Sequence, residues 1–405
     1  MFSVSDPGWR KPAGDRHKIH WKCPRPGTIF KSSSESDISI FNKLSLKKIP
    51  YFSKVKKYSE NFKIIKRVGR MNIVDLHSDI ITNIAFRRAN GESRVFEKCH
   101  LPQLKENGVV GLICVIWVEP MFRHNPLQRF WQLLQYALDD FRECSEVEIV
   151  TSAVDLDVYK HSGKVFIYLG LEGLSFMEEW GGSSDIEKVS RSVEELDQRH
   201  IRHSIFAWNE ANFLATGTGT EANKRGLTKS GAFAAEQMQN KGWIIDVSHL
   251  DAPSFWDAVK QTSCPLIASH SNAKQLCDHE RNLTDEQLKA IAGRNGLIGV
   301  NAHAEFVSDD NPSLEKFVDH VVYMAELVGV EHVGFGFDFT NYLKDYDLGL
   351  SELPVTKDLE SIAGVPALMD EMLKRGFSTS EMERVCSTNA LAFLHNHLCV
   401  QKKIP

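Results

Sequence analysis

From residue 71 onward, short apolar runs alternate with longer amphipathic stretches. The short runs are rich in Val, Ile, Leu and Phe and are bounded by turn-forming residues, a pattern that is typical of β-strands. Eight runs are expected to form strands: Asn72–Leu76, Val109–Trp117, Lys164–Leu171, Ile201–Trp208, Trp243–Val247, Pro265–Ser269, Gly296–Asn301 and His332–Phe337. Because helical stretches separate them, the pattern predicts strand–helix–strand units and a parallel sheet.

The amphipathic stretches repeat apolar residues at helical spacing and are long enough to return the chain for the next parallel strand. They include Glu187–Arg199, Ser230–Lys241, Asp285–Arg294 and Leu314–Val328, and after the last strand Ile362–Arg375 and Thr379–His395 are expected as closing helices. Eight such units predict an α/β fold, a (β/α)8 TIM barrel. The rival fold, a doubly wound open sheet, expects a glycine-rich turn after the first strand, where this chain has His77-Ser78-Asp79-Ile80.

Residues 1–70 differ in charge from the rest of the chain. They hold 17 Lys and Arg against five Asp and Glu, a net charge of +12, whereas residues 71–405 carry a net charge of −17. The segment is rich in Lys, Ser and Pro, so it is expected to be a disordered basic leader before a barrel domain of residues 71–400. A nucleic-acid-binding arm and an organelle transit peptide are alternatives, but an upstream start assignment, with Met71 as the biological start, is favoured.

Composition excludes several classes of protein. The 42% apolar and 25% charged residues are those of a globular protein with a sizeable core. Eight cysteines without a Cys-x-x-Cys pair indicate neither a disulfide framework nor a thiolate zinc site, so a reducing, cytoplasmic location is expected. No apolar run approaches the ~18 residues of a membrane span. The acidic barrel would repel a polyanion, so no nucleic acid partner is expected.

Residues that can hold a metal ion follow five of the expected strands directly. They are His77 and Asp79 after the first strand, Glu172 after the third, His249 after the fifth, His270 after the sixth and Asp338 after the eighth. In a barrel the carboxyl ends of all strands meet at one rim, so these side chains converge. A divalent ion needs neutral imidazoles and ionised carboxylates aimed at one point, and strand ends hold them rigidly.

Two ions that share a bridging carboxylate need about five ligands. The chain supplies that number with His77, Asp79, Glu172, His249 and His270. A single His after a strand is more often a hydrogen-bonded side chain, so the interpretation depends on the coincidence of all five. Most other histidines are expected to be solvated or packed, and His303, just after the seventh strand, is the one placed to reach the rim. Asn209 and Asn212 are expected to shape a loop, for which an Asx turn is an equal explanation.

Together these residues resemble the membrane (renal-type) dipeptidase family of metallopeptidases, peptidase family M19, among the amidohydrolase-like barrels. The resemblance runs from about Asn72 to Leu394. Its landmarks are the His-x-Asp at 77–79, the Gly-Leu-Glu-Gly turn at 170–173, Gly226-Leu227-Thr228, Ile245-Asp246-Val247-Ser248-His249, Ser269-His270-Ser271-Asn272-Ala273, Arg281-Asn282-Leu283-Thr284-Asp285, the Gly-x-Gly-x-Asp segment at 334–338 and Asn389-Ala390-Leu391. In this order and spacing the landmarks are specific.

The resemblance implies two Zn²⁺ ions per chain, or other divalent ions in their place. One ion would be held by His77 and Asp79 and the other by His249 and His270, with Glu172 bridging them. A hydroxide held between the ions would attack the scissile carbonyl, and Asp338 would carry the proton to the leaving amine. Arg281 would pair with the substrate's terminal carboxylate, although a surface ion pair would be the simpler account without the motif around it. Members of the family often form homodimers.

The chain departs from the family pattern at two places. Many members carry a substrate-binding His after the fourth strand, but this chain has Trp208 in Phe206-Ala207-Trp208-Asn209, which resembles the bacterial-type subfamily. An indole donates one hydrogen bond and carries no charge, so substrate preference is open. After the eighth strand the chain reads Gly336-Phe337-Asp338-Phe339-Thr340-Asn341 in place of the more usual Ser-Asp-Phe-Asp-Gly, which keeps the acid and changes its surroundings.

Three functions remain open. The leading hypothesis is a zinc-dependent dipeptidase acting on dipeptides with a free C-terminal carboxylate, including those with a D-residue on that side. The second keeps the metals but acts on an acylated amino acid, a lactam or a secondary-metabolite dipeptide, and sensitivity to loss of Arg281 would separate the two. The third is a catalytically silent binding protein on the same scaffold, against which the retained cluster of carboxylates argues.

Overall fold

The computed structural model describes residues 71–220, 225–348 and 354–400. Eight parallel strands form a closed barrel, which confirms the predicted fold. The barrel strands are β1 (Ile73–Ser78), β2 (Val109–Trp117), β4 (Val165–Glu172), β5 (His203–Ile205), β6 (Ile244–Asp246), β7 (Leu266–Ala268), β8 (Leu297–Val300) and β9 (Val333–Phe335). Each pairs with its neighbours in this order, and β9 pairs with β1 to close the ring. The predicted leader, residues 1–70, lies outside the described residues.

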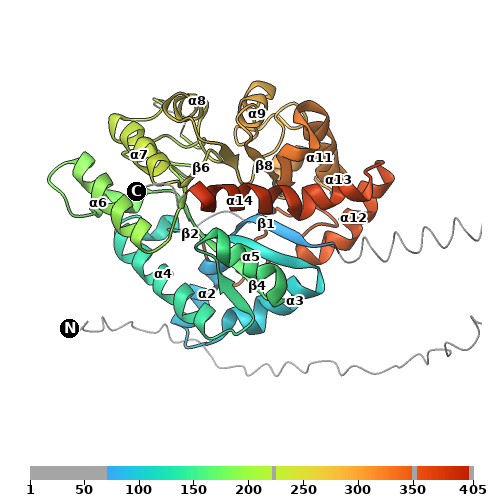
Figure 1. Cartoon of the computed structure of the whole chain (residues 1–405), viewed down its shortest axis with the longest axis horizontal. Helices are drawn as coiled ribbons and strands as arrows, with labels where there is room; N and C mark the ends of the chain where they lie inside the picture. The colour runs from blue at the N-terminus through green and yellow to red at the C-terminus, as the bar shows by residue number, and fades with distance from the viewer. Residues whose placement is uncertain (1–70, 221–224, 349–353, 401–405) are drawn as a thin grey trace, which may run out of the picture. The chain divides into compact units, whose positions relative to one another are not determined.

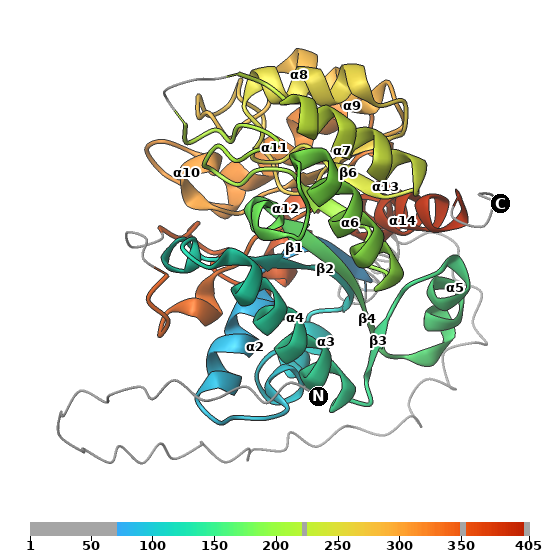
Figure 2. The ribbon, with the colours of Figure 1, turned by 90° about the vertical axis from the view of Figure 1, so that its left-hand side faces the viewer.

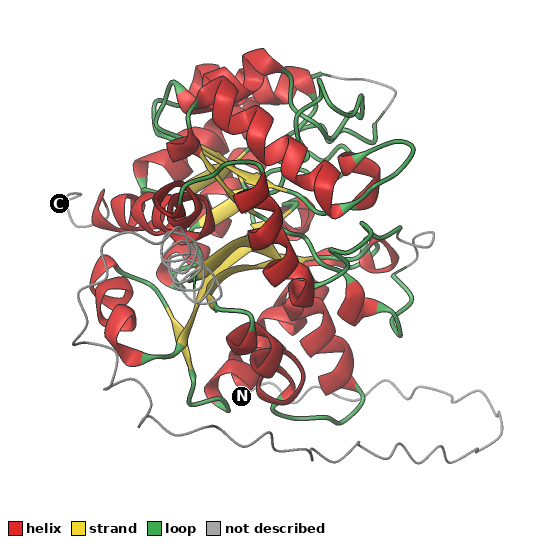
Figure 3. Ribbon diagram, turned by 90° about the vertical axis from the view of Figure 1, so that its right-hand side faces the viewer, coloured by secondary structure: helices red, strands yellow, loops and turns green. Residues whose placement is uncertain are grey.

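Helices surround the strands, which run through the centre of Figure 3. The α-helices are α2 (Ile80–Ala89), α3 (Leu101–Glu106), α4 (Pro126–Arg142), α5 (Ala153–Ser162), α6 (Asp185–Gln198), α7 (Lys229–Asn240), α8 (Ala252–Gln261), α9 (Asp285–Ala292), α10 (Ala304–Val307), α11 (Leu314–Val328), α12 (Val365–Lys374), α13 (Thr379–Glu383) and α14 (Asn389–Val400). Short 3₁₀ helices are η4 (Pro120–Phe122), η5 (Ser175–Glu179), η6 (Val330–His332), η7 (Asn341–Leu343) and η8 (Ile362–Gly364), and π-helical turns are η3 (Phe96–His100) and η9 (Arg384–Thr388). Within the described part of the chain, we find no helix that is long and apolar enough to cross a membrane.

The predicted closing helices are confirmed as α12, α13 and α14, the last of which lies across the barrel in Figure 1. Side chains of alternate strand positions fill the barrel interior, among them Leu76, Val115 and Phe166. Phe393 and Leu394 of α14 belong to the same apolar cluster. Burying these residues stabilises the barrel and fixes the positions of the strand ends, because each large apolar side chain contributes about 1.5–3 kcal/mol.

A ninth strand, β3 (Val147–Ile149), was not predicted. It pairs with the beginning of β4, through Val147 and Val165, and lies outside the ring of eight. Figure 2 shows β3 and the following helix α5 beside β4. Three residues are too few to produce a periodic pattern, so the sequence carried little signal for this strand.

Candidate metal centre

The predicted ligands lie at the C-terminal ends of the barrel strands. His77 is the second-last residue of β1, Glu172 ends β4, His249 follows β6 and His270 follows β7. Val74 and Leu76 fill the barrel interior, so a regular strand would turn His77 outward. The pairing of β1 with β2 is irregular between Asp75 and Ser78, and irregularities of this kind re-aim side chains.

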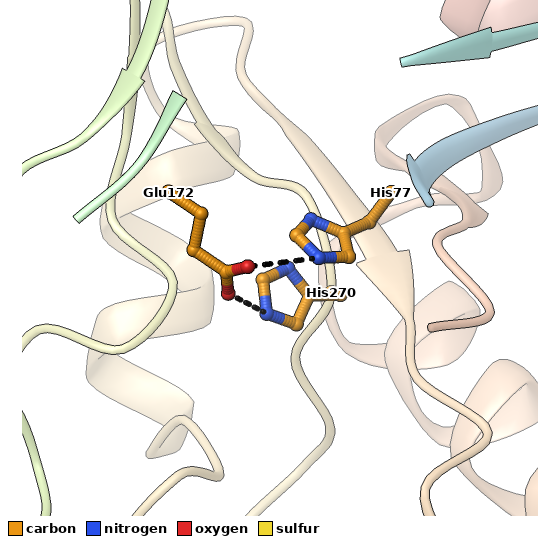
Figure 4. A group of neighbouring side chains, drawn as sticks. All are labelled: His77, Glu172 and His270. Carbon is orange, nitrogen blue, oxygen red and sulfur yellow. Dashed lines mark ion pairs between the residues drawn. The ribbon is translucent and has the colours of Figure 1, made fainter. Parts of the chain in front are cut away.

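Glu172 is the common neighbour of the three imidazoles. Its Oε2 lies 3.5 Å from His77 Nε2, and its Oε1 lies 2.8 Å from His249 Nε2 and 3.6 Å from His270 Nε2. Figure 4 shows the carboxylate of Glu172 pointing between the rings of His77 and His270. Both oxygens of one carboxylate therefore face nitrogen ligands on different strands.

A second group of ligand atoms adjoins the first through His77. His77 Nε2 lies 3.8 Å from Asp79 Oδ2 and 3.9 Å from Asp338 Oδ1. One ligand atom from each member of His77, Glu172 and His270, and likewise of His77, Asp79 and Asp338, lies within 4.8 Å of the others. The two groups share His77, so the residues form one continuous candidate metal site.

The imidazole rings of His249 and His270 each have a hydrogen-bond partner at Nδ1. His249 Nδ1 lies 2.8 Å from Asn209 Oδ1, an acceptor, so this nitrogen donates and Nε2 presents its lone pair to the centre. His270 Nδ1 lies 2.8 Å from Ser269 Oγ, and the Nε2 atoms of the two rings are 2.9 Å apart. The lone pair of His249 Nε2 thus faces a carboxylate oxygen of Glu172, an arrangement that needs a cation or a proton between the two.

Burial shapes the protonation of the centre. It lowers the pKa values of His249 and His270 well below the ordinary range, so both rings are neutral, as metal ligands must be. Burial also raises the pKa values of Glu172 and Asp338. His77 behaves differently: burial lowers its pKa, but the carboxylates of Glu172, Asp79 and Asp338 together outweigh burial and raise the pKa well above the ordinary value. A bound cation would stabilise the carboxylates in their charged form and so lower the pKa values of Glu172 and Asp338.

Two residues of the centre have a left-handed backbone. His249 has φ +67° and Asp338 has φ +60°, a region that non-glycine residues avoid. Strained backbone of this kind costs of the order of 1–3 kcal/mol and collects at functional sites. Asp338 is further fixed by Asn301, whose Nδ2 donates to its Oδ2 at 3.1 Å.

Two buried aspartates connect the strands that carry the ligands. Asp75 Oδ1 accepts the backbone N–H groups of His77 at 3.3 Å and Phe337 at 2.9 Å, which ties β1 to the segment before Asp338. Asp246 Oδ1 accepts those of Ser248 at 2.9 Å and Ser269 at 3.1 Å, which ties the segment before His249 to the one before His270. Each half of the centre therefore has an internal carboxylate that fixes its backbone.

A cavity of about 490 Å³ opens over the centre. On one side it is lined by Arg281, which is only 4% exposed and whose Nε has no hydrogen-bond partner. Arg281 Nη2 donates to the backbone oxygen of His270 at 3.3 Å, and burial lowers the pKa of the guanidinium to about 10. Among the described residues no carboxylate lies within ion-pair distance of Arg281, so the surface ion pair considered from the sequence is not formed.

Another part of the lining is apolar and consists of Trp117, Trp208, Leu343 and Leu348. Trp208 follows β5, and its ring centroid lies 5.1 Å from that of Trp117 and 6.0 Å from that of His249. Trp208 therefore stands beside the metal centre and lines the cavity.

All eight site residues predicted from the sequence lie at this one end of the barrel, His77, Asp79, Glu172 and His249 with His270 at the centre and Asp338, Arg281 and Trp208 around it. His303 also lines the cavity, as does His279, which was not singled out. Asn209, which was expected to shape a loop, contacts His249. Other contributors had no assigned role: Ser269, Asn301, Asp75, Asp246 and Trp117. All but Asp75, which lies within β1, are at or just after a strand end, and that position was the available signal.

A (β/α)8 barrel with histidines and carboxylates gathered at the C-terminal strand ends defines a class, the metal-dependent hydrolases built on this barrel. The chain belongs to the membrane dipeptidase family (peptidase family M19), whose model matches residues 63–403. The resemblance found in the sequence is thereby confirmed, and the chain is an enzyme of the hydrolase class.

Individual relatives agree with this assignment. The chain is 32% identical over 283 residues to the "uncharacterized protein in pqqA 5'region" of Klebsiella pneumoniae, with 67% of this chain and 97% of that protein covered. It is 31% identical over 244 residues to dipeptidase aclJ of Aspergillus oryzae, covering 58% of this chain but only 52% of that protein. A solved metallo peptidase from Rhodobacter sphaeroides, liganded with a phosphinate mimic of the dipeptide L-Ala-D-Ala, has the same fold: TM-score 0.70, 21% identity, 80% of this chain and 99% of that one covered.

Proposed function

We propose that this enzyme is a zinc-dependent dipeptidase, which hydrolyses dipeptides that have a free C-terminal carboxylate, including those with a C-terminal D-residue. The observation that carries the proposal is the contact of His249 Nε2 with Glu172 Oε1 at 2.8 Å, two acceptor atoms in a buried site. Membership of the dipeptidase family and the similarity to a fungal dipeptidase support the substrate class.

The donor set fits a pair of zinc ions. His77 and Asp79 would hold one ion, His249 and His270 the other, and the two oxygens of Glu172 would serve both. Three buried atoms without hydrogen-bond partners, His77 Nδ1 and Nε2 and Asp79 Oδ1, are free to coordinate. Nitrogen and carboxylate oxygen ligands suit zinc. Bound zinc would supply Lewis acidity at the scissile carbonyl and lower the pKa of water.

Asp338 is placed to move the proton. Its Oδ1 is 3.9 Å from His77 Nε2, it lines the cavity, and Asn301 holds its other oxygen. Burial raises its pKa, so this carboxyl group takes up a proton more readily than an exposed Asp. Asp338 therefore accepts the proton of the attacking water and returns it to the leaving amine, the work of a general base and then a general acid.

Arg281 binds the C-terminal carboxylate of the substrate. A buried guanidinium that lacks a carboxylate partner is costly, and a planar bidentate pair with the substrate would satisfy it. Neither oxygen of that pair depends on the configuration of the adjacent α-carbon, so a D-residue can be accepted. Trp208 would line the substrate site with one indole donor in place of the family's histidine.

The setting of the enzyme is also a proposal. A cytoplasmic location is supported by seven free cysteines within the described residues, since free thiols are typical of proteins in reducing compartments. The substrate is the one partner that the site requires, and a homodimer stays a prediction.

The test is elemental analysis of metal in the purified protein, paired with hydrolysis of L,L and L,D dipeptides by the wild type and by His249→Ala. About two zinc ions per chain, and hydrolysis that the variant loses, are expected. Bound metal without cleavage of any dipeptide would move the enzyme to another amide substrate. A protein that binds no divalent ion would overturn the proposal.

A further inference from the structure

The apolar part of the cavity lining is formed by four side chains that pack against one another. Trp117 and Leu343 are each 4% exposed and Leu348 is 7% exposed, and these three form a small apolar cluster against which Trp208 packs. All four also line the cavity over the metal centre. We call them the aromatic wall.

Charged groups support the aromatic wall without entering it. Arg123 lies over the ring of Trp208, with its Cζ 5.8 Å from the ring centroid. It also forms an ion pair with Glu210, in which Arg123 Nη1 is 2.7 Å from Glu210 Oε1. Arg123 Nη1 also lies 2.8 Å from Ser175 Oγ. Neither Arg123 nor Glu210 is part of the cavity lining, so the pair holds the indole in place while the wall presents apolar surface to the cavity.

Trp117 of the aromatic wall and Arg281 stand on opposite sides of the barrel. Trp117 ends β2, and Arg281 follows β7. In the ring of eight strands, β2 and β7 are separated by three strands in either direction, so they face each other across the barrel. The metal centre lies between them.

We propose that the aromatic wall binds the side chain of the substrate's N-terminal residue and selects large apolar or aromatic side chains there. This inference builds on the proposed function, because it needs the substrate carboxylate at Arg281. With that carboxylate bound near β7 and the peptide bond at the centre, the N-terminal residue points toward β2 and contacts the wall. Burying such a side chain favours apolar substrates, because it removes apolar surface from water.

The distribution of charge in the cavity strengthens the inference. Arg281, which follows β7, is the one lysine or arginine that lines the cavity in the described part of the chain, and the aromatic wall itself holds no charged side chain. A carboxylate on the N-terminal side chain would therefore lie against the wall without a cationic partner, which is unfavourable. Glutamate at this position should be rejected, whereas phenylalanine and leucine should be preferred.

The experiment compares kcat/KM for Phe-Ala, Leu-Ala, Ala-Ala, Glu-Ala and Lys-Ala with the metal-loaded enzyme, and repeats the comparison with Ala-Phe. We expect Phe-Ala and Leu-Ala to exceed Ala-Ala about 10-fold, Glu-Ala to fall below it about 10-fold, and Ala-Phe to show no comparable gain over Ala-Ala. A gain with Ala-Phe in place of Phe-Ala, or a preference for Lys-Ala, would overturn the inference.

Leu343→Lys provides a test that partial unfolding cannot imitate. A lysine in the wall gives the side chain of Glu-Ala a partner, so the ratio of kcat/KM for Glu-Ala to that for Phe-Ala should rise at least about 10-fold. The matched control is Val158→Lys, which places the same charge on α5 at a side chain that is 61% exposed and should leave the ratio at its wild-type value. An unchanged ratio in Leu343→Lys would overturn the inference.

The results separate this inference from the proposed function. Equal kcat/KM values for all the dipeptides would remove the side-chain preference and leave the dipeptidase intact. Failure of the metal-loaded enzyme to cleave any of them would overturn the proposed function and the inference together.

Discussion

The two halves of the candidate metal centre differ in how firmly hydrogen bonds orient their ligands. In the β6/β7 half, which holds His249 and His270, the far nitrogen of each ring is fixed at 2.8 Å by Asn209 or Ser269. In the β1/β9 half, His77 has no hydrogen-bond partner at either ring nitrogen. A ligand that is already oriented loses less entropy on binding an ion, so we expect the β6/β7 half to bind zinc more tightly. The ligand side chains of the β1/β9 half would become oriented only when the ion binds.

The largest effect is expected from Glu172→Gln, which alters both halves at once. The amide has no negative charge and one acceptor atom in place of two, so it cannot serve both ions, and the ion that it still contacts has a neutral ligand. We expect kcat/KM to fall about 10⁴-fold, equivalent to about 5.5 kcal/mol, and zinc content to fall below two per chain. Retention of full activity with two ions bound would show that the carboxylate does not join the halves.

Asp338→Asn separates chemistry from metal binding. Asp338 lies in the β1/β9 half, but its proposed work is proton transfer, for which positioned groups typically contribute 10²–10⁴-fold. We expect kcat to fall about 10³-fold with the zinc content unchanged. Asn301→Ala is a milder companion, because it removes the donor that holds Asp338 Oδ2. Loss of an ion in Asp338→Asn would instead make Asp338 a ligand of the β1/β9 half.

Much of the barrel was predictable because the strands leave apolar runs in the sequence and the helices leave helical periodicity. The eight barrel strands were found, although the strand predicted as Ile201–Trp208 spans only His203–Ile205. Beyond Ile205 the chain turns into a loop stabilised by side chains, such as Asn212 donating to the oxygen of Phe206. Periodicity cannot show where backbone pairing stops, because apolar residues continue past that point.

The candidate ligands were predictable because the C-terminal ends of all parallel strands lie at the same rim of the barrel. The residues that orient them were not, since their roles depend on contacts between different strands. Asn209 and His249 are 40 positions apart, and only the register of β5 and β6 brings them together. The aromatic wall is a similar case: Leu343 reaches Trp117 through a loop after β9 whose path leaves no periodic trace. The ligand roles themselves stay predictions.

The internal aspartates allow the two halves to be compared in stability. Asp75 and Asp246 each accept two backbone N–H groups, but Asp246 also pairs with His203, 3.0 Å from Nε2 to Oδ2. We expect Asp246→Ala to lower the free energy of unfolding of the metal-free protein by about 3 kcal/mol and Asp75→Ala by about 2 kcal/mol, because each leaves buried donors unpaired. Urea unfolding measures both. Asp→Asn variants keep an acceptor and should recover most of the loss, and equal losses in the two alanine variants would remove the difference.

The smallest effect tests the contrast between the halves directly. Asn209→Ala frees Nδ1 of His249 without touching a proposed ligand, so zinc affinity at the β6/β7 half should weaken about 10–100-fold, the usual range for such orienting contacts. Ser269→Ala is the matched variant for His270 and should weaken it less, because Asp246 still holds the backbone N–H of residue 269. Calorimetric titration of the metal-free protein with zinc measures both. If the affinity of the tighter site is unchanged in Asn209→Ala, that site is not the β6/β7 half. Weakening confined to the looser site would mean that the β1/β9 half fills first, and the order that we infer from the hydrogen bonds would be reversed.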